Sequence, residues 1–108
     1  LTRDGHAVEV FANIGESAGV ASAVEQGAEG IGLLRPALFF MAHPPAPDEA
    51  TQEAEYRRVL DGLHGRPLVV RPLDVGGDQP LPYWPIAGEG YPFLGVRGIR
   101  LTLLRPQI

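Results

Sequence analysis

Residues 30–35 read Gly-Ile-Gly-Leu-Leu-Arg, and this stretch decides the fold that the sequence predicts. Its centre, Ile31 to Leu34, is short and apolar with no polar alternation, which is typical of a strand covered on both faces in a parallel sheet. Arg35 stands where the apolar run ends. Because a guanidinium at the end of a buried strand is costly to place without an anion, its position indicates a phosphate or carboxylate site.

The same pattern occurs twice more along the chain. Arg71 follows the apolar run 67–70, and Arg97 follows 93–96. All nine basic residues are arginines, so the residue type alone is weak support for anion binding. Position carries the argument, and it makes Arg35, Arg71 and Arg97 the candidate ligand-binding residues. The alternative for Arg35 and Arg71 is an ion pair with a nearby carboxylate such as Asp74 or Asp78, and the alternative for Arg97 is a residue at the N-terminus of a helix.

The flanking segments alternate between strand and helix patterns. Strands are predicted at 8–12, 31–34 and 68–70, and helices at 16–27, 49–63 and 97–104. Asp48 is the expected N-cap of the long helix. Its predicted buried face consists of Tyr56, Val59, Leu60 and Leu63, and its predicted solvated face of Glu53, Glu55, Arg57 and Arg58. The apolar residues Phe39, Phe40 and Met41 are expected to pack against the outside of the sheet rather than to line a cofactor pocket.

This order predicts an α/β fold with parallel strands joined by helical crossovers. In such sheets ligands bind beyond the carboxyl ends of the strands, where Asn13, Arg35 and Arg71 are expected. A complete (β/α)8 TIM barrel needs about 250 residues. We therefore expect residues 1–108 to form the N-terminal part of such a barrel domain, roughly its first three βα units.

Composition excludes several classes of protein. The net charge of −4 argues against a nucleic-acid partner, and no apolar run approaches the length that membrane insertion requires. The chain has no cysteine, which fits a cytoplasmic location. The three histidines, His6, His43 and His64, have no second ligand at suitable spacing, so no metal site is predicted within the chain.

Three motifs in order resemble the phosphoenolpyruvate-utilising enzymes. They are Gly27-Ala28-Glu29-Gly30-Ile31-Gly32-Leu33-Leu34-Arg35, then Val70-Arg71-Pro72-Leu73-Asp74-Val75-Gly76-Gly77-Asp78, then Pro92-Phe93-Leu94-Gly95-Val96-Arg97-Gly98-Ile99-Arg100. Within that family the resemblance is closest to enzyme I of the bacterial sugar phosphotransferase system, a phosphoenolpyruvate-protein phosphotransferase, including the fructose-type multiphosphoryl transfer proteins.

The resemblance implies a barrel that binds phosphoenolpyruvate with Mg²⁺ and passes the phosphoryl group through an enzyme histidine to the phosphocarrier protein HPr. By motif position, Arg35 and Arg71 resemble the arginines that hold the substrate phosphate, and Arg97 a further site arginine. The Mg²⁺ ligands and the phosphoaccepting histidine are expected outside these residues, so the chain alone is expected to be inactive. The family also implies a homo-oligomer.

The motifs depart from the family pattern at several positions. Pro36-Ala37 replaces Thr-Glu, Pro72 replaces Thr, Gln79 replaces Lys, and Tyr91 replaces Asn. These departures leave open a non-catalytic binding or dimerisation module. The barrel of a pyruvate-phosphate dikinase or phosphoenolpyruvate synthase is the other enzyme alternative.

Overall fold

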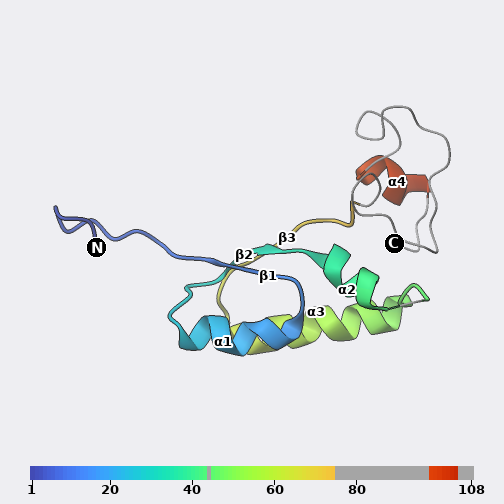
Figure 1. Ribbon diagram of the computed structural model, residues 1–108, viewed down its shortest axis with the longest axis horizontal. Helices are drawn as coiled ribbons and strands as arrows, with labels where there is room; N and C mark the ends of the chain where they lie inside the picture. Colours follow the sequence, from blue (N-terminus) through green and yellow to red (C-terminus); the bar gives the residue numbers. More distant parts are fainter. Residues whose placement is uncertain (44, 75–97, 105–108) are drawn as a thin grey trace.

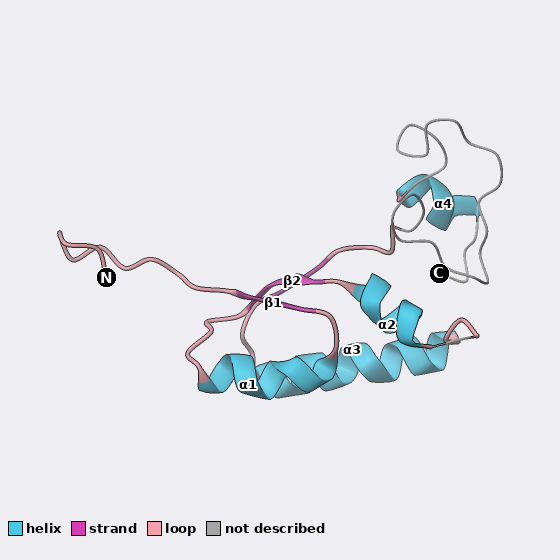
Figure 2. Ribbon diagram, in the orientation of Figure 1, coloured by secondary structure: helices cyan, strands magenta, loops and turns pink. Residues whose placement is uncertain are grey.

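A three-stranded parallel sheet organises the chain. The computed structural model describes residues 1–43, 45–74 and 98–104. The strands are β1 (Ala12–Ile14), β2 (Ile31–Leu34) and β3 (Leu68–Val70), in the order β1-β2-β3, and both pairings are parallel. Figure 2 shows the short strands side by side. The predicted α/β class with parallel strands is therefore confirmed.

Helices α1 (Val20–Glu25) and α3 (Glu49–Leu63) cover one side of this sheet (Figure 1). The core lies between the two layers and is formed by Val20, Ile31, Leu34, Val59 and Leu63, each at most 3% exposed. The two helices approach closely at Gly62, where an added Cβ would lie 2.9 Å from Val20 Cγ1. Burial of these branched side chains is the main stabilising contribution to the unit.

Two helical segments sit at the strand ends. A 3₁₀ turn, η1 (Ser17–Gly19), precedes α1, and the helix ends before Gly27, whose φ of 92° suits glycine. Helix α2 (Pro36–Ala42) begins directly after β2 with a proline at its first position, where the missing N–H costs nothing. Phe39 and Phe40 of α2 are buried, as expected, whereas Met41 is half exposed. Helix α4 (Ile99–Leu104) is the last described element.

The first strand begins four residues later than the sequence predicted. The alternating segment 8–12 has high β propensity, but Val8 and Val10 are each 61% exposed. Regular pairing starts only where the partner strand starts, at Ala12 opposite Ile31. Asn13 therefore lies inside β1 rather than beyond its end. The prediction was wrong because the neighbouring strand, not local propensity, sets the limits of β1.

The buried face of α3 also differs from the predicted one. Val59 and Leu63 are buried as expected, but Leu60 is 54% exposed and Glu55, expected in solvent, is 8% exposed. The stripe follows the spacing 55, 59, 63, which places one side chain above the next on a single helix face. Leu60 falls outside this stripe.

Replacement of Asp48 by alanine is expected to lower the thermal midpoint of the chain by a few degrees. Asp48 Oδ1 accepts a hydrogen bond from Thr51 N at 2.8 Å, which caps the start of α3. Hydrogen bonds from the Thr51 side chain and N–H hold the pKa of Asp48 below its ordinary value. The cap therefore stabilises fully above the ordinary carboxyl pKa, and its contribution falls as pH drops through the lowered folded pKa.

Circular dichroism melting of both variants checks this expectation. The matched control is Asp61→Ala, an exposed aspartate near the other end of α3, where a negative charge opposes the helix dipole. Equal destabilisation by the two substitutions would contradict the capping role of Asp48.

Candidate functional site

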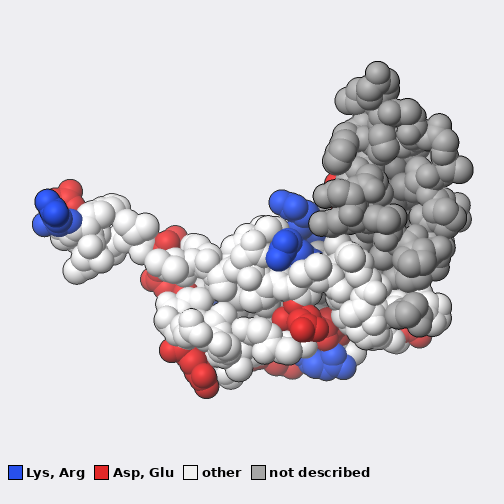
Figure 3. Space-filling model, in the orientation of Figure 1, with Lys and Arg blue, Asp and Glu red and all other residues white. Residues whose placement is uncertain are grey.

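The candidate site lies at the carboxyl edge of the sheet, where Arg35 and Arg71 follow β2 and β3. Leu34 and Val70, the last residues of these strands, are partners in the parallel register. The two arginines come directly after them and thus occupy equivalent positions on neighbouring strands. Basic side chains gather beside these strands, on the side away from α1 and α3, in Figure 3.

Backbone hydrogen bonds hold both arginines at this level. Arg35 N donates to Ile14 O at 3.0 Å, and Arg71 N donates to Leu34 O at 3.1 Å. The main chain of each arginine is thus fixed to the strand before it in the sheet. The ends of all three strands meet at one edge, and this edge carries both candidate residues.

Their side chains are accessible. Arg35 is exposed although Leu34 and Pro36 on either side of it are buried, so its side chain faces away from the core. Arg71 is also exposed. The ion pairs found among the described residues join Glu53 to Arg57 and Glu55 to Arg58, and neither candidate guanidinium takes part in them.

Asp74, which the sequence offers as an alternative partner for Arg35 and Arg71, contacts a backbone N–H in the structure. Its Oδ1 accepts a hydrogen bond from Gly98 N at 3.1 Å. This contact ties the segment after β3 to the residue immediately before α4. Asp78, the other carboxylate suggested as a partner, and Arg97, the third candidate arginine, lie outside the described residues.

The departure at Pro36 has a structural explanation. Arg35 is the N-cap of α2, with an extended backbone at φ −107° and ψ 90°, and Pro36 occupies the first helical position. The residue before a proline favours extended geometry, so Pro36 helps to fix the main chain of Arg35. The replacement of Thr at this position is compatible with an ordered site.

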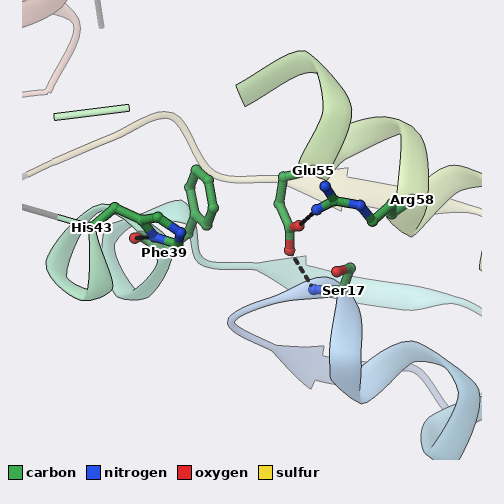
Figure 4. A network of polar contacts seen from close by, with 5 residues as sticks. All are labelled: Ser17, Phe39, His43, Glu55 and Arg58. Atoms are coloured by element: carbon green, nitrogen blue, oxygen red, sulfur yellow. Dashed lines mark hydrogen bonds and ion pairs between the residues drawn. The ribbon is translucent and has the colours of Figure 1, made fainter. Parts of the chain in front are cut away.

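One further residue was missed by sequence reasoning. Glu55 is buried on α3, its Oε1 accepts from Ser17 N at 2.6 Å, and its Oε2 accepts from Arg58 Nη1 at 2.6 Å (Figure 4). Burial raises the pKa of Glu55, but hydrogen bonds from the Ser17 N–H and hydroxyl, with the Arg58 charge, outweigh it and leave the pKa lowered. Its four-residue spacing from Val59 was the signal available in the sequence.

Within the described ranges, no three His, Asp or Glu side chains come together as a metal site requires. No described helix has the length and apolar character needed to span a bilayer.

Comparison with known proteins identifies the family. The family model for the PEP-binding domain of PEP-utilising enzymes matches residues 1–108. A phosphoenolpyruvate-protein phosphotransferase of Staphylococcus carnosus is 46% identical over 108 residues, all of this chain and 19% of the relative. The corresponding protein of Geobacillus stearothermophilus is 48% identical over 103 residues, 95% of this chain and 18% of the relative.

A second kind of relative carries a different name. A multiphosphoryl transfer protein of Rhodobacter capsulatus is 48% identical over 103 residues, 95% of this chain and 12% of the relative. The chain thus spans less than a fifth of the length of these three relatives. The resemblance seen in the three sequence motifs is confirmed, and the chain belongs to the family of PEP-utilising enzymes, within their PEP-binding domain.

Proposed function

We propose that the chain is the N-terminal part of a phosphoenolpyruvate-binding (β/α)8 barrel, in an enzyme-I-like phosphoenolpyruvate-protein phosphotransferase. Three observations support it: the family match over residues 1–108, relatives of that name, and three parallel strands joined by helices. The full-length protein takes the phosphoryl group of phosphoenolpyruvate onto a histidine and passes it to an HPr-like carrier. It works as a cytoplasmic homo-oligomer.

Arg35 and Arg71 bind the substrate phosphate in this proposal. The single observation that carries it is their equivalent position after partnered residues of β2 and β3. Two forked guanidinium groups side by side match the oxygens of a phosphoryl group and offset the charge that moves as the P–O bond loosens. Arg97 adds a third cationic group by motif position. Mg²⁺ is held by residues beyond this chain.

Titration of the full-length protein with phosphoenolpyruvate and Mg²⁺ tests the proposal. Saturable heat of binding is expected, and phosphoenolpyruvate should protect the protein against thermal unfolding by mass action. A correctly folded protein that gives no saturable heat would contradict the proposal. That result would instead favour a module without catalytic function.

The isolated 108-residue chain is expected to transfer no phosphoryl group. The proposed phosphoaccepting histidine and metal ligands belong to other parts of the protein, so the chain lacks the chemistry even where it keeps the two arginines. The measurement is phosphorylation of HPr with labelled phosphoenolpyruvate, with the full-length protein as the positive control. Label transfer to HPr by the isolated chain would contradict this assignment.

A further inference from the structure

A buried carboxylate lies beneath the candidate site. Glu55 is the one charged residue that the described part of the chain buries, at 8% exposure. Taking a carboxylate out of water is costly unless every partner is well placed. By contrast Glu53, two residues earlier on the same helix, pairs with Arg57 at 2.6 Å while both side chains remain about two-thirds exposed. The position of Glu55 therefore calls for a structural reason.

Its contacts give that reason. Oε1 of Glu55 accepts the backbone N–H of Ser17, the first residue of η1, across 38 positions of sequence. The first N–H groups of a helical segment have no partner within it. Glu16, the N-cap residue of η1, supplies no side-chain cap. Glu55 thus caps this turn from a different helix, and Arg58 balances its charge (Figure 4).

The capped turn borders the candidate site. A small cavity of about 10 Å³ touches the turn after β1 and the start of α2, and Gly15, Pro36 and Glu55 all line it. A Cβ on Gly15 would collide with the Leu38 side chain of α2, so the turn and α2 are in close contact. Ile14, directly before this turn, accepts the backbone N–H of Arg35.

We propose that Glu55 is a positioning residue for the anion site, which holds the turn after β1 against α2 and thereby fixes the main chain of Arg35. Glu55 lies under the site and is not a ligand of the substrate. The inference rests on the proposed function. It identifies Glu55 as the group that keeps Arg35, one of the two arginines, in its position. A small displacement of an oriented binding group is enough to weaken binding.

Glu55→Ala, made in the full-length protein, tests the inference by calorimetric titration with phosphoenolpyruvate and Mg²⁺. Loss of the clamp should raise the Kd about tenfold with unchanged stoichiometry, because each folded molecule binds more weakly. Glu55→Gln keeps an oxygen for the Ser17 N–H and should restore most of the affinity. The matched control, Glu53→Ala on the exposed part of α3, should leave the Kd unchanged.

Ser17→Pro provides a second variant that leaves Glu55 in place. It removes both Ser17 donors to Glu55, the N–H and the hydroxyl. Proline is tolerated at this first helical position, and Glu16 before it already has extended geometry at φ −155° and ψ 165°. A similar rise in Kd is expected. This variant keeps the inference testable even where Glu55→Ala fails to fold.

Each outcome has a distinct meaning. An unchanged Kd in folded Glu55→Ala or Ser17→Pro protein overturns the positioning role. The proposed function stands in that case, provided that the wild-type protein binds phosphoenolpyruvate. A lower stoichiometry at unchanged Kd shows a purely structural role and also overturns the inference. Wild-type protein that binds no phosphoenolpyruvate overturns the proposed function and this inference together.

Discussion

Substitution of Arg71 by methionine in the full-length protein is expected to weaken phosphoenolpyruvate binding about a hundredfold. A forked guanidinium makes two charge-assisted hydrogen bonds to a phosphoryl group, and loss of such contacts costs about 3 kcal/mol. Arg35→Met should have an effect of the same size, because the two arginines follow partnered residues of neighbouring strands. Calorimetric titration with phosphoenolpyruvate and Mg²⁺ measures both.

Two control variants separate the site from general electrostatics. Arg57→Met removes a charge from the exposed part of α3, where the side chain is 69% exposed, and should leave the Kd unchanged. Arg71→Lys keeps the charge but loses the planar fork, and should recover only part of the affinity. Equal loss in Arg57→Met and Arg71→Met would show that net charge, rather than these two positions, governs binding.

Truncation of Leu63 to alanine is expected to destabilise the chain by about 2–5 kcal/mol. Leu63 is 1% exposed and packs in the core cluster with Val59 and Ile31, so its loss leaves a cavity between α3 and the sheet. A loss of this size is a large part of the stability of any small domain. Urea unfolding followed by circular dichroism measures the change in the free energy of unfolding.

Leu60→Ala is the matched control for Leu63→Ala. The two leucines lie three residues apart on α3, and Leu60 is 54% exposed. Its truncation should change the free energy of unfolding by less than about 0.5 kcal/mol. Comparable losses in the two variants would contradict the core that we assign between α3 and the sheet.

Elements with strong local signals were predictable from the sequence. The long helix α3 has an N-capping aspartate, Asp48, and its predicted range of 49–63 is confirmed. Strands β2 and β3 were also found at their predicted positions. Short apolar runs ended by an arginine were sufficient to predict them, because both ends of β2 pair with β3, at Ile31 opposite Leu68 and at Leu34 opposite Val70.

Other features depend on contacts that no local pattern records. Helix α2 was not predicted, and the structure uses Pro36 as its first helical residue. Burial of Glu55 was not predicted, because a carboxylate is expected in solvent unless it has a partner. In the structure that partner is the N–H of Ser17. That partner is distant in sequence, and only the packing of α3 near η1 brings the two together.

The placement of the two arginines was predictable in part. The sequence predicted that Arg35 and Arg71 stand at the same edge of a parallel sheet, and the structure puts their backbones at equivalent positions there. Convergence of their side chains on a single ligand stays a prediction. Arg97 adds to that prediction from its motif alone.

A crystal structure of the full-length protein with phosphoenolpyruvate tests the central claim most directly. We predict that phosphoryl oxygens of one bound molecule lie about 2.7–2.9 Å from guanidinium nitrogens of both Arg35 and Arg71. Phosphoenolpyruvate bound elsewhere, or held at this edge of the sheet without contact to either arginine, would contradict the claim.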